Sequence, residues 1–139
     1  MDSKLTVDEM WYVTTFEDTT GASVKDCIKN SDEIIFVVKK GDMGLAIGKN
    51  GANINRAREK LGKKIEVIEH SDDPVEFVKR LFHSLRVEDG QMAGENDKVI
   101  RVSIDERDKK MAIGLKGKKL SKVKMLAKRF HGIEDVIID

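Results

Sequence analysis

The strongest constraint on the fold is an internal repeat with a period of 66 residues. Residues 46–51 spell Ala-Ile-Gly-Lys-Asn-Gly, and residues 112–117 spell Ala-Ile-Gly-Leu-Lys-Gly. The same shift places an alternating apolar run on a second one, with Ile34, Phe36 and Val38 falling on Ile100, Val102 and Ile104. A period this long that occurs twice indicates two copies of a compact module rather than a stacked array of short repeats.

Each copy is expected to contain the element order α-β-β-α-α-β. The first helix starts at a capping box over residues 6–9 in the first copy, and at Asp73-Pro74 in the second. Strand-like runs predict strands over residues 22–29, 33–39 and 64–68, and over residues 86–93, 99–105 and 133–138. The run over residues 86–93 is the least regular of these, because Asp89 and Gly90 interrupt it.

The opening helices supply candidate core residues. In the first copy, Trp11 and Phe16 are expected to point into the core. In the second copy, helical spacing predicts one apolar face made of Val75, Val78, Leu81, Phe82 and Leu85. The boundary between the copies is expected at residues 71–73. The predicted fold class is therefore α+β, with two domains over residues 1–72 and 73–139, each a three-stranded sheet packed on helices.

Composition narrows the class of protein. No apolar run approaches the roughly 18 residues of a membrane span, and the N-terminus lacks a signal peptide pattern, so a cytoplasmic protein is expected. The only cysteine, Cys27, is expected to be a small buried strand residue. The histidines His70, His83 and His131 lie far apart without metal-ligand spacing. We expect no metal, no cofactor and no small-molecule substrate.

The charge is distributed unevenly. The chain carries 26 basic and 25 acidic residues, a net charge of +1. The acids are frequent in the first 33 residues, whereas residues 107–129 are densely basic. A solvated helix face explains such a run as well as a polyanionic partner does, so the asymmetry alone does not decide between them.

The two Gly-x-x-Gly segments carry the sharper signal. One such motif means little, since a chain of this length contains roughly one by chance, and residues 41–44 are such a match without a counterpart in the second copy. The repeated motifs instead follow an Ala-Ile pair and precede a helix with no acid in its first turn. Glycines permit close backbone approach, and an acid-free helix start favours an external anion. We expect phosphate at both loops, with a plain helix-helix turn as the alternative.

These motifs resemble those of the KH domain family, in which Ile-Gly-x-x-Gly is followed by an apolar residue, here Ile54 or Leu120. The α-β-β-α-α-β order is similar to the type II arrangement, and the resemblance covers essentially the whole chain. It implies that each loop clamps the backbone of single-stranded RNA while the bases lie in an adjacent apolar groove. With few aromatic residues, stacking on rings cannot be the main source of affinity.

The residues expected to contact RNA follow from that resemblance and from the loop chemistry. They are Ile47, Gly48, Lys49, Asn50, Gly51 and Ile54 in the first copy, and Ile113, Gly114, Leu115, Lys116, Gly117, Lys118 and Lys119 in the second. A place in the core is an equally good interpretation for Ile47, Ile54, Ile113 and Leu120. Further basic residues, Arg56, Arg58, Lys122 and Lys124, extend the positive path. Leu115 replaces Lys49, so the two clamps are expected to be unequal.

The paired modules and the run over residues 36–51 resemble the archaeal NusA family of transcription elongation and termination factors. That resemblance implies binding of nascent RNA, with RNA polymerase or the transcription complex as a second partner. Three alternatives stay open. They are a ribosome-associated or RNA-processing KH protein, a protein-interaction module with vestigial loops, and a nucleotide hydrolase using residues 44–49. The last lacks the spacing and the Ser or Thr of a Walker A loop, so we expect no enzyme.

Overall fold

The structure is a computed structural model that describes residues 5–82 and 85–139. The chain divides into two compact units, one ending at His70 and the other beginning at Ser71, and each is described by itself. His83, one of the histidines considered above, lies outside the described residues. Both units have the element order expected from the sequence, and the fold is mixed α+β, with two three-stranded sheets packed on helices.

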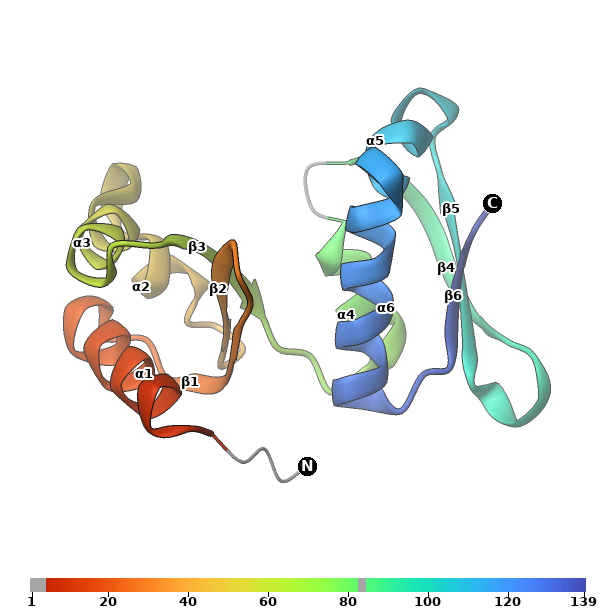
Figure 1. Cartoon of the computed structure of the whole chain (residues 1–139). Helices are drawn as coiled ribbons and strands as arrows, with labels where there is room; N and C mark the ends of the chain where they lie inside the picture. Colours follow the sequence, from red (N-terminus) through yellow and green to blue (C-terminus); the bar gives the residue numbers. More distant parts are fainter. Residues whose placement is uncertain (1–4, 83–84) are drawn as a thin grey trace. The chain divides into compact units, whose positions relative to one another are not determined.

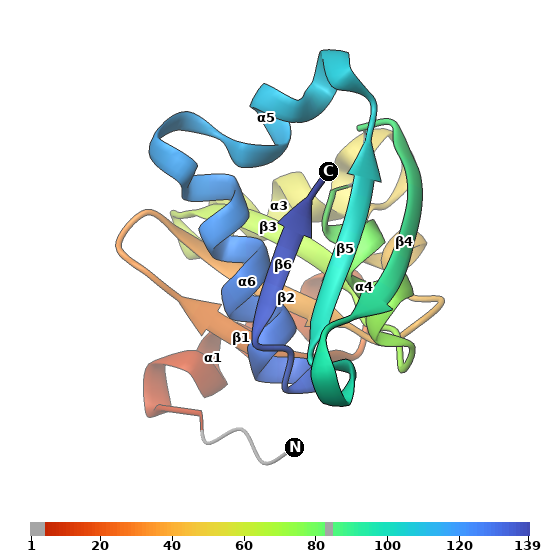
Figure 2. The same cartoon turned by 90° about the vertical axis from the view of Figure 1, so that its right-hand side faces the viewer.

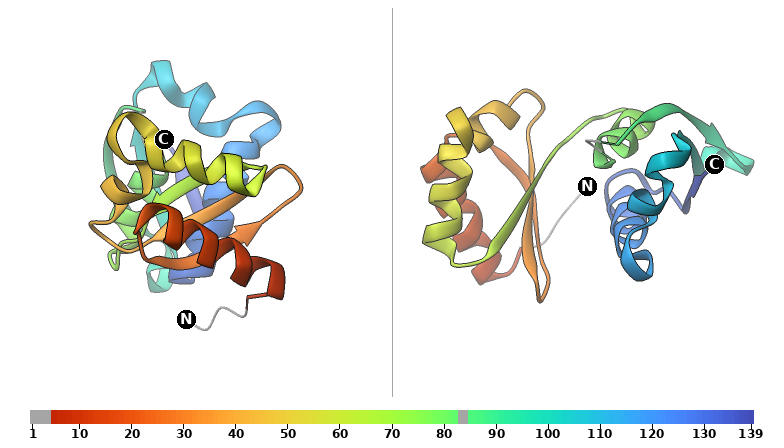
Figure 3. Two further views of the ribbon diagram at one scale, coloured as in Figure 1. Left: turned by 90° about the vertical axis from the view of Figure 1, so that its left-hand side faces the viewer. Right: turned by 90° about the horizontal axis from the view of Figure 1, so that it is seen from above.

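The first unit places three helices on one sheet (Figure 1). Its elements are α1 (Val7–Thr20), β1 (Val24–Lys29), β2 (Glu33–Val38), α2 (Met43–Ile47), α3 (Ala52–Leu61) and β3 (Lys64–Glu69). The central strand β2 pairs antiparallel with β1 and parallel with β3. Figure 3, seen from above, shows the helices of this unit on one face of the sheet. This leaves the junction between α2 and α3 at one end of the helical layer.

The first helix, α1, begins where the capping box predicts. The Thr6 side chain accepts a hydrogen bond from the Glu9 backbone N–H, and the Glu9 carboxylate accepts one from the Thr6 backbone N–H, at 3.1 and 2.9 Å. Two of the backbone donors at the helix start are therefore satisfied within the chain. At the other end, Gly21 takes a left-handed conformation with φ 81° and ends the helix.

The core of the first unit lies between α1 and the sheet. Phe16 stacks on Phe36 with ring centroids 4.2 Å apart, and both side chains are fully buried. Cys27 is buried in β1, as predicted. The prediction for Trp11 is wrong, because its side chain is 55% exposed. Its neighbour Tyr12, about 100° further around the helix, takes the inward position instead.

The second unit repeats this arrangement (Figure 2). Its elements are α4 (Pro74–Leu81), β4 (Val87–Ala93), β5 (Val99–Ile104), α5 (Lys109–Ile113), α6 (Lys118–His131) and β6 (Asp135–Ile138). The strand β5 pairs antiparallel with β4 and parallel with β6. The Asp73 carboxylate caps α4 by accepting from Val75, and Pro74 occupies the first turn. As in the first unit, the junction between two consecutive helices, here α5 and α6, lies at one end of the helical layer.

Two details of the second unit differ from the simple pattern. The apolar face expected to reach Leu85 is too long, because α4 ends at Leu81 and Phe82 has left the helical conformation with ψ 28°. The irregular strand β4 does form, with a shift in register between Val87 and Asp89. A Cβ on Gly90 would lie 3.1 Å from Cγ1 of Val75. The glycine that weakens the strand pattern therefore lets α4 pack closely against the sheet.

Candidate nucleic-acid interface

The first Gly-x-x-Gly loop is a sharp turn between α2 and α3. Gly48 has φ 77° and ψ 171°, a combination essentially restricted to glycine. Asn50 and Gly51 then adopt left-handed conformations with φ 54° and φ 77°. The loop residues Lys49 and Asn50 are exposed. The turn therefore presents two polar side chains to solvent directly before the start of α3.

The second loop has the same backbone geometry. Gly114 has φ 81° and ψ 169°, Lys116 has φ 56°, and Gly117 has φ 74°. Each value lies within a few degrees of its counterpart 66 residues earlier. The repeat detected in the sequence is thus a repeat of conformation at the loops, residue by residue.

Each loop begins with a close approach to the helix that follows. A Cβ on Gly48 would lie 2.7 Å from Cγ and 2.8 Å from the backbone N of Asn53, and a Cβ on Gly114 would lie 2.7 Å from Cβ and 2.8 Å from the backbone N of Lys119. Real Cβ atoms essentially never approach other heavy atoms so closely. The first glycine of each motif is therefore required by packing as well as by its backbone angles.

The chance match over residues 41–44 forms a different structure. Gly41 lies in the turn after β2 with φ 92°, whereas Gly44 is inside α2. Residues 44–47 are therefore helical, and the loop of the repeated motif begins only at Gly48. A Walker A loop instead wraps phosphate with its glycines between a strand and a helix. The geometry here offers no such cradle.

The helices that follow the loops start without the caps that α1 and α4 have. Among the described residues, no side chain caps the start of α3 or α6, and the first turns of both contain no acid. In α6 the first turn instead carries Lys118 and Lys119. An uncapped helix start attracts an anion through its free N–H groups and its dipole, and in α6 the neighbouring cations strengthen this preference. Both starts are therefore suited to bind phosphate.

The expected contact residues divide into exposed and buried groups. Lys49, Asn50, Lys116 and Lys118 are exposed, and Leu115 is 82% exposed. Lys119 is half-buried.

The four apolar candidates differ. Ile54 is only 7% exposed and belongs to the core, and the half-buried Ile47 packs against that core. Ile113 is 42% exposed, and Leu120 is half-buried.

An open hollow of about 540 Å³ lies against the second loop. It is lined by Lys110, Met111, Ile113, Gly114, Leu115 and Lys116. Lys110 and Met111 were not predicted from the sequence as site residues. Both occupy exposed positions of α5 about one turn before the loop, and that position is the pattern that could have identified them. Met111 is 66% exposed, so the hollow combines an apolar floor with two lysines.

The more distant basic residues have partners within their own unit. Arg58 donates to Oδ1 of Asn55 at 3.0 Å, and Nζ of Lys124 lies 3.1 Å from Oδ1 of Asp135. Arg56 is exposed. The exposed lysines at the loops are therefore better placed to meet an anion than Arg58 or Lys124.

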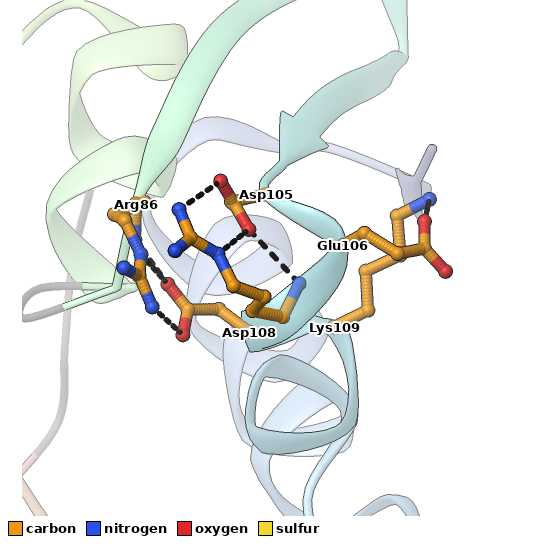
Figure 4. Close-up of polar contacts among 6 residues, drawn as sticks. Arg86, Asp105, Glu106, Asp108 and Lys109 are labelled. Carbon is orange, nitrogen blue, oxygen red and sulfur yellow. Dashed lines mark hydrogen bonds and ion pairs between the residues drawn. The ribbon is translucent and has the colours of Figure 1, made fainter.

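An aspartate anchors the short helix before each loop. The backbone N–H of Ser23 donates to Oδ2 of Asp42 at 2.8 Å, and that of Arg86 donates to Oδ2 of Asp108 at 2.8 Å. In the second unit the Arg86 guanidinium adds two bonds, from Nε at 2.9 Å and from Nη2 at 3.1 Å (Figure 4). These hydrogen bonds lower the pKa of the Asp108 carboxyl below its ordinary value. The pair fixes the start of α5, and hence the loop that follows it.

The side chain of Asn53 performs a related task in the first unit. Its Nδ2 donates to the backbone carbonyl of Leu45 at 2.7 Å, which joins the start of α3 to α2 across the loop. The sequence interpretation noted Asn53 only as a residue that is not an acid. This hydrogen bond holds the two helices together beside the loop. The side chains of Lys49 and Asn50 are therefore not needed to connect them.

Comparison with known proteins agrees with this geometry. The model of the KH domain family matches residues 12–88, more than half of the chain and including the first loop. A probable transcription termination protein NusA from Methanococcus vannielii is 38% identical over 98% of this chain and 79% of its own length. The chain belongs to the archaeal NusA family of KH-domain proteins.

Another relative and a solved structure match over a similar extent. The protein of the same name from Methanocaldococcus jannaschii is 34% identical and covers 96% of this chain and 73% of its own length. The crystal structure of APE1850 superposes with a TM-score of 0.82 at 34% identity, over 97% of this chain and 100% of that one. The similarity to this family therefore extends through both units.

Among the residues described, no helix is both long and apolar enough to span a bilayer.

Proposed function

We propose that this NusA-family chain binds single-stranded RNA through two tandem type II KH domains, residues 1–72 and 73–139, and acts on nascent RNA in transcription elongation and termination. RNA polymerase or the transcription complex is the protein partner that this role implies. In this role the chain binds RNA and catalyses no reaction. The relatives, which are named as probable transcription termination proteins, are the support for the role in transcription.

One observation carries the RNA-binding part of the proposal. Two loops of the same backbone geometry, 66 residues apart, both precede a helix that starts without an acid or a side-chain cap among the described residues. The helices that open the two units, α1 and α4, do have such caps. Uncapped helix starts next to lysines favour a phosphate backbone over any neutral ligand.

The conformation of Lys116 supports a functional role for the second loop. A left-handed conformation with φ 56° costs a non-glycine residue roughly 1–2 kcal/mol, and lysine lacks the local hydrogen bonding that eases it for asparagine. A strained residue that is also exposed and cationic is better explained by a bound anion than by packing.

The two loops support unequal roles. The first loop presents the polar side chains of Lys49 and Asn50, whereas the second presents Leu115 and Lys116 beside the apolar hollow. We expect the first loop to hold the RNA backbone mainly by charge and hydrogen bonding. We expect the second to add apolar contact with bases.

Paired aspartate substitutions test the proposal directly. Lys49→Asp with Asn50→Asp, and Leu115→Asp with Lys116→Asp, place negative charge where phosphate is expected, on exposed side chains that the core does not need. We expect each pair to weaken binding of a fluorescent single-stranded RNA at least tenfold, with an unchanged circular dichroism spectrum. Lys25→Asp with Lys29→Asp on β1 is the matched control for lost positive charge. Unchanged RNA affinity in both loop variants would show that the clamps are misassigned.

The transcription role needs a separate measurement. Archaeal RNA polymerase transcribing a template with a terminator should show altered read-through when the chain is added, and the loop variants should reduce that effect in proportion to their RNA affinity. If the chain binds RNA but leaves termination unchanged and instead associates with ribosomal subunits, the ribosome-associated alternative is correct.

A further inference from the structure

The outer face of α1 exposes three large apolar side chains, and none of them is among the residues expected to contact RNA. Val7, Met10 and Trp11 are 78%, 50% and 55% exposed. Their spacing of three and four residues makes them neighbours on one side of the helix. Thr14 and Asp18 continue the same line toward the C-terminal end of α1, and both are exposed. This outer face is therefore a continuous stripe along the helix.

The helix is apolar on two opposite sides, but its own unit covers only one of them. Tyr12, Phe16 and Thr20 are buried, and α1 packs against α3 and β1 (Figures 1 and 3). A helix with a single apolar side is what a surface position in a globular unit requires. The second side needs another explanation. In α4, the corresponding helix of the second unit, every residue is described and no large apolar side chain is exposed.

The charged residues of α1 itself have one sign, and Nζ of Lys29 on β1 lies over the ring of Tyr12 at 5.7 Å from its centroid. The helix α1 contains four acids, Asp8, Glu9, Glu17 and Asp18, and no lysine or arginine. Glu9 completes the capping box, and Glu17 accepts a hydrogen bond from the Val24 backbone at 2.8 Å. Asp8 and Asp18 are exposed and have no cationic partner within the described part of the chain. Two carboxylates, one beside the exposed apolar residues and one in line with them, therefore keep their charge unneutralised.

We infer that the outer face of α1, formed by Val7, Met10, Trp11, Asp8 and Asp18, docks a positively charged amphipathic segment of another protein. Apolar side chains of that segment cover Val7, Met10 and Trp11, and its lysines or arginines meet the two carboxylates. An exposed tryptophan within a small apolar patch is typical of the residues that dominate protein interfaces. The acidic rim sets the sign of the partner's charge and steers its approach.

Two other occupants fit this face less well. RNA is repelled by a helix that carries four acids and no base, so the RNA-binding loops and this face have opposite electrostatic preferences. A symmetric contact between two copies would bring the α1 acids of each against those of the other. A distinct, basic partner avoids both penalties.

Trp11 is also the probe for the first experiment, because it is the only tryptophan in the chain. Caesium ions and iodide should both quench its fluorescence in the intact chain. Relative to their effect on free tryptophan, caesium should keep more of its quenching than iodide, because the surrounding charge is negative. Adding an amphipathic Leu/Lys peptide of about 15 residues, long enough to form a helix, should protect Trp11 from quenching. If Trp11 is already shielded in the intact chain, the face is covered from within and the inference is wrong.

Calorimetric titration with the same peptide locates the contact. Met10→Gln combined with Trp11→Gln removes apolar surface without changing charge, and should weaken peptide binding roughly tenfold or more. Met125→Gln, which changes an exposed methionine on α6, is the matched control and should leave binding unchanged. Asp8→Asn combined with Asp18→Asn should weaken binding less, and the difference should vanish at high salt.

Several outcomes would overturn the inference. They are failure of the Leu/Lys peptide to bind, equal binding by a Ser/Lys peptide of the same charge, and equal affinity in the Met10→Gln, Trp11→Gln variant. If that variant instead lost affinity for single-stranded RNA, the face would belong to the RNA site. If it abolished self-association in sedimentation, the occupant would be a second copy of the chain.

Discussion

Gly48 lies so close to Asn53 that a Cβ at position 48 would stand 2.7 Å from Cγ and 2.8 Å from the backbone N of Asn53. The second glycine of the same motif, Gly51, has no such neighbour, since its nearest contact would be Nδ2 of Asn55 at 3.6 Å. The two glycines therefore serve different purposes. Gly48 allows α2 and α3 to meet, whereas Gly51 only provides a left-handed turn.

This difference predicts unequal effects of alanine. Gly51→Ala should lower the free energy of unfolding by about 1 kcal/mol, the cost of a left-handed conformation. Gly48→Ala should cost about 3 kcal/mol, because a glycine-only conformation and a steric clash add together. Urea unfolding followed by Trp11 fluorescence measures the first unit, which contains the only tryptophan. Equal losses in the two variants would mean that the helices move apart at little cost.

Lys116→Asn should separate stability from RNA binding. Asparagine tolerates the left-handed conformation at position 116, as Asn50 does in the first loop, so the variant should gain up to about 1 kcal/mol in stability. It should also lose one phosphate contact, which reduces the slope of log K against log salt by about 0.7 for single-stranded RNA. Lys25→Asn, at an exposed position on β1, should leave that slope unchanged. A slope unaffected by Lys116→Asn would remove Lys116 from the clamp.

The position of Leu115 predicts a gain of function. Leu115 is 82% exposed and stands where the first loop has Lys49. Leu115→Lys should strengthen binding of single-stranded RNA several-fold at low salt and steepen its salt dependence, because it adds a cation beside the phosphate path. The reciprocal change, Lys49→Leu, should have the opposite effect. Fluorescence anisotropy measures both. Weaker binding by Leu115→Lys would indicate that the apolar side chain itself contacts a base.

The sequence predicted the elements well because capping and periodicity are local. Thr6 with Glu9 and Asp73 with Pro74 mark helix starts whose hydrogen bonds span only a few residues. The error at Trp11 arose because Trp11 and Tyr12 are both large and aromatic, so the inward position depends on how α1 is rotated against β1 and α3. That rotation is set by tertiary packing rather than by α1 alone.

The Asp108 anchor was missed for a different reason. Its partner Arg86 is 22 residues away, and the contact depends on where β4 begins. The loop between β4 and β5 is longer than the turn between β1 and β2, so Arg86 corresponds in space to Ser23, although the 66-residue shift does not align them. Repeats detected at a fixed shift lose such pairs wherever one copy has an insertion.

The anchor between Arg86 and Asp108 makes the second unit sensitive to acid. The Arg86 guanidinium and backbone N–H hold the pKa of the Asp108 carboxyl below its ordinary value (Figure 4). Hydrogen bonds from Arg107 likewise lower the pKa of the Asp105 carboxyl. A carboxyl whose pKa is lower in the folded state binds fewer protons there. It therefore stabilises the fold above its unfolded pKa of about 3.9 and loses that contribution as the pH falls further.

Asp108→Asn should reveal this contribution through its pH dependence. The variant should be less stable than the parent near pH 7, and the difference should shrink as the pH falls below about 4, because there the carboxyl of the unfolded parent takes up a proton before the folded one does. Urea unfolding followed by circular dichroism between pH 2 and 7 measures both chains. Glu106→Gln is the control, since the ion pair of Glu106 with Lys109 is on the surface and exposed pairs contribute little. A difference between parent and Asp108→Asn that stays constant with pH would mean that the geometry of the hydrogen bonds, and not the charge of Asp108, holds α5 in place.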